Sequence, residues 1–183
     1  MPRLFTGLEI PQSQQLLLSL KQSGLDNIRW IEPADMHITL RFIGDVSPSL
    51  ANDIVDQLRH QEYEAPTIRL GELKAFGNSK PRTIYASVAQ DDGLDPLHEG
   101  QESLFRSLGL EAETRKYVPH VTLGRCRNCS AEDVAAYLGV FAELISEPFV
   151  PSSYALYSAK KSTGGGPYLV EERFALTTRL TNA

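Results

Sequence analysis

The sequence has little cysteine and no long apolar run, and these shortages exclude several classes of protein. Only two of its 183 residues are cysteines, Cys126 and Cys129, which is too few for a disulfide framework. No segment approaches the roughly 18 uninterrupted apolar residues that a membrane-spanning helix needs. Glu9 also comes too early for the apolar region of a signal peptide. We therefore expect a cytoplasmic protein without a membrane partner.

Basic residues are outnumbered as well. The chain has 18 lysines and arginines against 23 aspartates and glutamates, a net charge of −5. Proteins that hold long duplexes by neutralising phosphates are usually basic. If a nucleic acid is the substrate, we expect contact to be local, at an end or a single nucleotide. The hydrophobic content of 42% and charged content of 22% are ordinary for a globular protein.

The most informative feature is a four-residue pattern that occurs twice, at His37-Ile38-Thr39-Leu40 and His120-Val121-Thr122-Leu123. Both copies stand in β-branched, apolar surroundings, which predicts two strands. Alternate side chains of a strand share a face. Each strand is therefore expected to present a histidine and a threonine on one face and to pack its other face against a core.

The spacing around the two motifs is repeated too. Ten residues separate His37 from a predicted helix start at Ser47, and ten separate His120 from another at Ser130. A strand and a helix precede each motif, and a helix and a strand follow it. This favours an internal duplication with a period of 120 − 37 = 83 residues. The predicted strands are 3–10, 28–31, 36–43, 67–76, 83–89, 117–123, 153–160 and 168–180, and the predicted helices are 12–22, 47–60, 94–108 and 130–138.

Two facing histidines supply an acid and a base near neutral pH, because the pKa of imidazole is about 6.5. The threonine hydroxyls and the nearby Arg125 can bind the oxygens of a small anion between the rings. This arrangement suits in-line displacement at phosphorus. A strained cyclic phosphodiester is an apt substrate, since it can open without a metal ion.

At these residues the sequence resembles the two-histidine (2H) phosphoesterases, and among them the RNA 2′,3′-cyclic phosphodiesterases, also called 2′-5′ RNA ligases. Residues 3–11 are similar to the family's opening strand, 37–45 and 119–125 to its two signatures, and 156–158 and 166–168 to its closing hairpin. The resemblance implies one α+β domain, residues 1–183, made of two intertwined lobes. Two mainly antiparallel sheets flanked by helices would be related by a pseudo-twofold axis, with the active site in the central cleft.

The resemblance also implies a reaction and the residues that perform it. A terminal 2′,3′-cyclic phosphate on RNA or a nucleotide would be hydrolysed to a 2′-phosphate and a 3′-hydroxyl, without metal or cofactor. The reverse reaction would form a 2′-5′ linkage at the same site, and no stable protein partner is implied. His37 would protonate the departing 3′-oxygen and His120 would activate water. The phosphate would be held by Thr39, Thr122 and Arg125.

Aromatic side chains are candidates for base recognition, as in many proteins that bind single-stranded RNA. Tyr85 and Tyr168 are predicted to contact the substrate, and Tyr117 is a further candidate. For Phe42 we favour core packing, because it stands five positions from His37 and a regular strand would point it away from the pocket.

Other patterns are expected to be structural. The Cys126–Cys129 pair lacks the second pair that a zinc site needs, so chance is favoured over a redox or metal role. Residues 164–166 are three glycines without the lysine of a phosphate-binding loop and are predicted to form a hairpin tip. His98 has no patterned partner, and Asp35 is interpreted as a turn residue.

Two other functions stay open at this point. The chain could hydrolyse a small nucleotide such as ADP-ribose 1″,2″-cyclic phosphate, or it could bind RNA ends without turnover. Replacing His37 or His120 with alanine would leave a binding module largely intact. The same change would slow an enzyme by about 10²-fold or more, the usual contribution of a positioned proton donor or acceptor.

Overall fold

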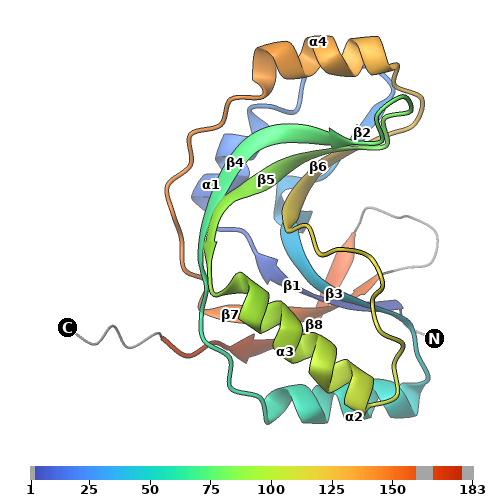
Figure 1. Ribbon diagram of the computed structural model, residues 1–183, viewed down its shortest axis with the longest axis vertical. Helices are drawn as coiled ribbons and strands as arrows, with labels where there is room; N and C mark the ends of the chain where they lie inside the picture. The colour runs from blue at the N-terminus through green and yellow to red at the C-terminus, as the bar shows by residue number, and fades with distance from the viewer. Residues whose placement is uncertain (1–2, 160–166, 179–183) are drawn as a thin grey trace.

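A computed structural model describes residues 3–159 and 167–178. A helix separates most successive strands, except between the fourth and the fifth and between the seventh and the eighth (Figure 1). In chain order they are β1 (Arg3–Glu9), α1 (Gln12–Ser19), β2 (Ile28–Trp30), the 3-10 helix η1 (Pro33–Asp35), β3 (His37–Asp45), α2 (Pro48–Arg59), β4 (Thr67–Phe76), β5 (Thr83–Asp92), α3 (Leu94–Ser107), β6 (His120–Cys126), α4 (Ala131–Phe141), β7 (Ser153–Ala159) and β8 (Tyr168–Ala175).

The strands form one sheet in the order β4-β5-β6-β3-β1-β7-β8, with β2 beside β6. The α+β class and the antiparallel pairing are confirmed. The expected division into two sheets needs a correction. The two motif strands, β3 and β6, meet at a single register pair, Ile38 with Val121, which joins the halves into one eight-stranded sheet.

The pairing also shows how the two halves of the chain, one around each motif, are connected. The first unit is β1-α1-β3-α2-β4 and the second is β5-α3-β6-α4-β7, apart from the insertions β2 and η1 and the final β8. The last strand of each unit pairs with the first strand of the other, β4 with β5 and β7 with β1. Each half of the sheet therefore contains strands from both units, with the motif strands at the centre.

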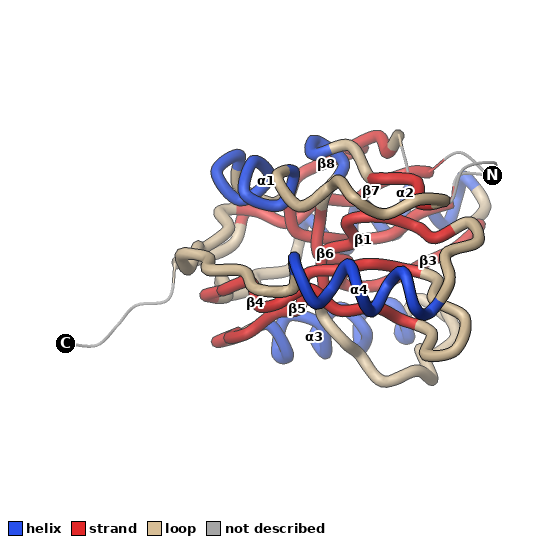
Figure 2. Tube along the Cα trace, turned by 90° about the horizontal axis from the view of Figure 1, so that it is seen from above, coloured by secondary structure: helices blue, strands red, loops and turns tan. Residues whose placement is uncertain are grey.

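The helices lie in two groups. In Figure 1, α1 and α4 are at the top of the molecule and α2 and α3 at the bottom, with the curved sheet between them. Figure 2, in which the molecule is seen from above, shows α4 crossing in front of the strands. Most fully buried side chains of the sheet and helices form one large core, which includes Leu8, Ile54, Phe105, Val121 and Tyr154, and a small second cluster contains Phe5, Ala155 and Tyr157. The rear faces of both motif strands are thus anchored in the large core.

Local signals explain where the helices begin and end. The hydroxyls of Ser47 and Ser130 accept bonds from the backbone N–H three residues on, at 3.2 and 3.0 Å, and cap α2 and α4 as predicted. Gly109 has φ +84° just after α3, the left-handed conformation that ends a helix. The register of β4 and β5 shifts between Leu70 and Leu73, an irregularity around Gly71.

Two predicted features lie outside the described residues: the glycine tip at 164–166 and the end of the last predicted strand beyond residue 178. Helix α1 ends at Ser19, earlier than predicted, and α4 continues to Phe141. In the part of the chain that the structure describes, no helix has the length and apolar character to cross a membrane.

Candidate active site

The two motifs share one small hollow at the junction of β3 and β6. The hollow has a volume of about 60 Å³. It therefore has room for a small group such as a phosphoryl. Its lining consists of Phe5, Ile31, Asp35, His37, Thr39, Phe42, His120, Thr122, Arg125 and Tyr168.

Both motif strands contain the same irregularity. In β3, Thr39 pairs with Gly7 and Arg41 with Thr6, so Leu40 has no opposite residue. In β6, Thr122 pairs with Tyr85 and Gly124 with Ile84, and here Leu123 has no opposite residue. Each fourth motif position is thus a β-bulge, which reverses the alternation of side chains beyond it. Both leucines are buried.

The bulges bring equivalent residues of the two units to the hollow. Phe42 is five positions after His37 and Arg125 is five after His120, and both line the hollow. The prediction of core packing for Phe42 is wrong, because its side chain is 54% exposed. A regular strand would have pointed Arg125 away as well, so the same bulge explains both positions.

The two imidazoles are held in the same way by the backbone. Nδ1 of His37 lies 2.7 Å from the carbonyl oxygen of Asp35, and Nδ1 of His120 lies 2.7 Å from that of Val118. In both cases the carbonyl belongs to the residue two positions earlier. Since a carbonyl only accepts, each neutral ring carries its proton on Nδ1 and leaves Nε2 as an acceptor.

Burial favours the neutral form of both rings. It lowers the pKa of His37 to about 4, an effect opposed by the bond to the Asp35 carbonyl and by the Asp35 carboxylate and reinforced by the charges of His120 and Arg125. Burial also lowers the pKa of His120, opposed by the Val118 carbonyl and reinforced by Arg125. A carboxylate thus supports a positive charge on His37 alone, so the two rings differ electrostatically.

The third polar group of the hollow is the guanidinium of Arg125. Its Nε is buried and has no hydrogen-bond partner among the described residues. An unpartnered buried donor is costly, and an anion in the hollow would satisfy it. The site therefore combines two hydroxyls, a guanidinium and two imidazoles around a space of phosphoryl size.

Aromatic rings surround each histidine differently. His37 packs against Phe5 and Tyr157, and Tyr168 meets it edge-on with ring centroids 5.1 Å apart. Tyr168 lines the hollow, and its contact with the substrate stays a prediction. Tyr85 does not line the hollow: it is buried and stacked on Phe76, with its ring edge-on to His120 at 5.2 Å. The structure therefore places Tyr85 behind a histidine rather than in the lining.

The bulge in β3 is held by two residues that sequence reasoning did not bring together. Nδ1 of His98 donates to the carbonyl of Leu40 at 2.8 Å, and the hydroxyl of Tyr117 donates to that of Thr39 at 3.1 Å. The two rings are stacked on each other with centroids 3.8 Å apart. His98 is 58 residues from Leu40 in the chain, so no local pattern indicates this contact.

Asp35 and Ile31 were also missed as lining residues. Asp35 ends the 3-10 helix η1, and its backbone and carboxylate both act on His37. Its position two residues before His37, matched by Val118 before His120, is the signal that could have identified it. Asp35 does lie in a turn, as expected, and the sequence interpretation missed only its second role beside the hollow.

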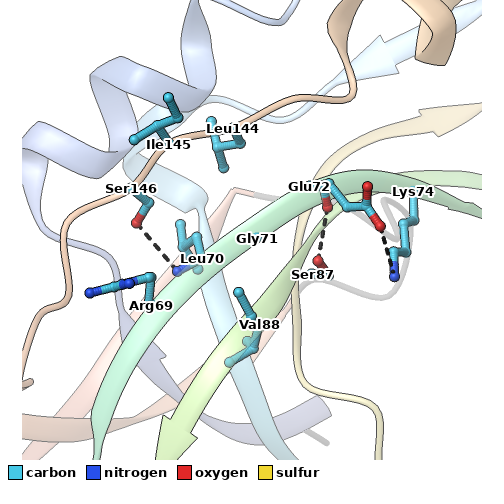
Figure 3. Close-up of a pocket in the computed structure, with 11 residues that line it drawn as sticks. Arg69, Leu70, Gly71, Glu72, Lys74, Ser87, Val88, Leu144, Ile145 and Ser146 are labelled. Carbon is cyan, nitrogen blue, oxygen red and sulfur yellow. Dashed lines mark hydrogen bonds and ion pairs between the residues drawn. The ribbon is translucent and has the colours of Figure 1, made fainter.

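A larger groove has no histidine among the described residues that line it. It has a volume of about 610 Å³ and runs between β4, β5 and residues 144–146 (Figure 3). Its contacts are structural: Ser146 accepts a bond from the Leu70 backbone, and Ser87 donates to the Glu72 carbonyl. No histidine or cysteine is among its lining residues. We therefore place the candidate active site in the smaller hollow.

The cysteine pair takes no part in the hollow. Burial, followed by the neighbouring Cys129, raises the pKa of Cys126 to about 12, so its thiolate is disfavoured. Cys129 lies 3.4 Å from the carbonyl oxygens of Asp26 and Asn27. Among the described residues, no three of the types His, Cys, Asp and Glu are grouped to hold a metal ion.

A sheet that joins two His-x-Thr strands at one anion-sized hollow defines a phosphoesterase of the two-histidine class. Comparison with known proteins gives the family: residues 8–85 and 87–168 match the model described as LigT like Phosphoesterase. The chain belongs to this family.

The relatives carry a common name. The chain is 28% identical over 130 residues to the RNA 2′,3′-cyclic phosphodiesterase of Bacillus subtilis (strain 168), covering 68% of this chain and 71% of that protein. It is 32% identical over 119 residues to the protein of the same name from Aeropyrum pernix, covering 64% and 66%. The crystal structure of E. coli LigT complexed with 3′-AMP has the same fold, with TM-score 0.80, 21% identity and coverage of 97% and 99%.

Proposed function

We propose that this protein hydrolyses the 2′,3′-cyclic phosphate of RNA ends or nucleotides to a 2′-phosphate and a 3′-hydroxyl. The observation that carries the proposal is the matched pair of imidazoles. Each is bonded at Nδ1 to the carbonyl two residues earlier, and both line a single phosphoryl-sized hollow with Thr39, Thr122 and Arg125. A donor and an acceptor on either side of one anion suit in-line displacement.

In the proposed reaction His120 takes a proton from water as the water oxygen bonds to phosphorus. The bond from phosphorus to the 3′-oxygen breaks, and His37 gives its proton to that oxygen. Thr39, Thr122 and Arg125 would hold the remaining phosphate oxygens. The Asp35 carboxylate supports this assignment, because it favours a charged ring at His37. A bound phosphate anion would raise the pKa of the ring from about 4, the low value to which burial brings it.

The aromatic lining of the hollow indicates where the rest of the substrate would lie. With the phosphoryl group between the two imidazoles, the nucleoside would lie towards Phe42, whose side chain is exposed, and Tyr168, which also lines the hollow. An aromatic face is a common partner for an unstacked base. We therefore propose Phe42 and Tyr168 as base contacts, and Tyr85 as a residue that supports His120.

The relatives' names support this choice of substrate, since the curated relatives above are named for RNA 2′,3′-cyclic phosphate and the E. coli protein is complexed with 3′-AMP. The reverse ligation would use the same groups. The location of the protein in the cytoplasm remains a prediction from the sequence.

The test is incubation of the protein with adenosine 2′,3′-cyclic phosphate, followed by separation of 2′-AMP from 3′-AMP. We expect turnover to 2′-AMP, and we expect it to persist in EDTA. Exclusive formation of 3′-AMP would show that the other oxygen leaves and would overturn the assigned geometry. Tight binding without turnover would instead favour the RNA-end binding module, and turnover of ADP-ribose 1″,2″-cyclic phosphate alone would favour the small-nucleotide enzyme.

A further inference from the structure

The β-bulge of each motif strand is bonded by a side chain from the other half of the chain. At the first bulge, Nδ1 of His98 on α3 donates to the Leu40 carbonyl at 2.8 Å. At the second, Nε2 of Gln22, in the turn after α1, donates to the Leu123 carbonyl at 3.1 Å. Both leucines are the fourth residues of their motifs, and α1 and α3 are the helices that precede the two motif strands. Gln22 is therefore the counterpart of His98 at the second motif.

Gln22 is bonded to two neighbouring parts of the site at once. Its Nε2 also donates to the Ile31 carbonyl at 2.6 Å, and the N–H of Ile31 donates to the Leu123 carbonyl at 2.8 Å. An amide NH2 group has two donor hydrogens, so one is available for each carbonyl. Ile31, the residue after β2, lines the hollow. The half-buried Gln22 thus joins the end of β2 to the bulge of β6.

The bulge at Leu123 is the feature that places Arg125 at the hollow. Leu123 has no opposite residue in β5, so the alternation of side chains reverses beyond it and Arg125 reaches the lining. Nε of Arg125 is buried and without a hydrogen-bond partner among the described residues. A donor that must meet an anion at hydrogen-bonding distance depends on the groups that fix its backbone. Gln22 is not in the lining, but it bonds the carbonyl at the bulge itself.

We propose that Gln22 is a positioning residue for phosphate binding: through the Leu123 carbonyl it holds the β6 bulge in the form that directs Arg125 to the hollow. This inference rests on the proposed function, because the anion held there is the phosphate of the substrate. Gln22 itself does not touch the substrate. Its loss should therefore weaken the binding of a phosphate group whatever else the substrate carries.

The experiment compares Gln22→Met with Gln15→Met by calorimetry with inorganic phosphate. Methionine has a similar length and no N–H donor. Gln15 is the matched control, because it is also half-buried and its Nε2 also donates to a carbonyl, that of Ile10 at 2.9 Å, outside the two motif strands. We expect the Kd of phosphate to rise about 10-fold in Gln22→Met, from the loss of bonds to two buried carbonyls, and to stay unchanged in Gln15→Met.

A double variant separates positioning from a general loss of order. Arg125→Gln alone should weaken phosphate binding. If Gln22 acts through Arg125, adding Gln22→Met to Arg125→Gln should change the Kd by less than about 2-fold, as for two residues that serve one interaction. Losses that multiply in the double variant, or the wild-type Kd in folded Gln22→Met, would overturn the proposal.

A measurement on the wild type makes the test independent of how the variants fold. In a nitrogen-15 NMR titration with phosphate, the side-chain NH2 resonances of Gln22 should shift, because the ligand engages the strand to which this amide is bonded. Those of Gln15 should stay in place. Gln22 resonances that do not respond to phosphate would also overturn the proposal.

Turnover separates this inference from the proposed reaction. Gln22→Met should lower kcat/KM by the same factor for adenosine 2′,3′-cyclic phosphate and glycerol 1,2-cyclic phosphate, since the phosphate is the part they share. If the wild type hydrolyses neither but its phosphate Kd depends on Gln22, the positioning role stands and the reaction fails. If hydrolysis occurs but Gln22→Met binds phosphate as the wild type does, the reaction stands and the positioning role fails.

Discussion

At the scale of single residues, His37 connects the chemistry of the site to the stability of the protein. Its ring lies among Phe5, Tyr157 and Tyr168, and burial lowers its pKa to about 4. An unfolded chain would protonate the same ring near pH 6.5. Between these values the unfolded state binds more protons, so the free energy of unfolding must decrease as the pH falls from 6.5 towards 4.

Replacing His37 with asparagine removes this dependence. We expect the wild type to lose about 2–3 kcal/mol more than His37→Asn between pH 7 and pH 4.5, from the pKa difference. Urea unfolding at a series of pH values measures the free energy of unfolding of both proteins. Parallel pH profiles for the two proteins would contradict the buried neutral ring.

The sequence predicted core packing for Phe42, whereas the structure exposes its side chain beside the hollow. This residue therefore allows a direct test of base contact. We expect Phe42→Ala to raise KM for adenosine 2′,3′-cyclic phosphate by about 10-fold, since stacking on one base is worth about 1–3 kcal/mol. Glycerol 1,2-cyclic phosphate has no base, so its KM should not change. Phe42→Trp should keep the wild-type behaviour.

The matched control is Val140→Ala, which shortens an exposed apolar side chain on α4 outside the hollow. This change should alter KM for neither substrate. An equal effect of Phe42→Ala on both substrates would mean that Phe42 shapes the hollow rather than contacting the base.

At the scale of elements, the β-bulge at Leu40 determines which side chains reach the hollow. The stacked pair of His98 and Tyr117 donates to the carbonyls of Leu40 and Thr39 and thereby holds the bulge open. These donors come from α3 and from the segment before β6, so the second unit positions the motif strand of the first.

Removing the donor on His98 should therefore impair the site from a distance. We expect His98→Ala to lower kcat/KM by about 10-fold and the free energy of unfolding by about 1–2 kcal/mol, for one lost hydrogen bond. His98→Gln keeps a donor and should recover part of kcat/KM. Both are measured on folded protein at matched concentration.

His60→Ala is the control for this prediction. Nδ1 of His60 also bonds a carbonyl, that of Asp56 at 2.6 Å, but on the exposed end of α2. It should leave kcat/KM unchanged. If His98→Ala left kcat/KM unchanged, as expected for His60→Ala, the hydrogen bond from His98 to the Leu40 carbonyl would have no functional role.

At the scale of the whole molecule, the doubled motif was enough to predict the centre of the fold. Repeated spacing around His37 and His120 indicated two related units, and the structure joins their motif strands at Ile38 and Val121. The helix caps at Ser47 and Ser130 depend on local sequence alone, so they could also be predicted.

What the sequence could not show depends on partners distant in the chain. The bulges at Leu40 and Leu123 exist because β1 and β5 pair with the motif strands in a shifted register, and register is decided by neighbouring strands. Counting positions from His37 therefore misplaced Phe42. The exchange of β4 and β7 between units, like the contact of His98 with Leu40, is also a tertiary feature.

The central claim is that the two imidazoles, one from each unit, act together on one phosphate. Its most direct test is single-turnover hydrolysis of adenosine 2′,3′-cyclic phosphate by His37→Asn, His120→Asn and the double variant. Each single change should slow the chemical step by about 10²-fold or more, and the double variant should be little slower than the slower single one, as for groups that act as a unit. Wild-type rate in either folded single variant would contradict the account.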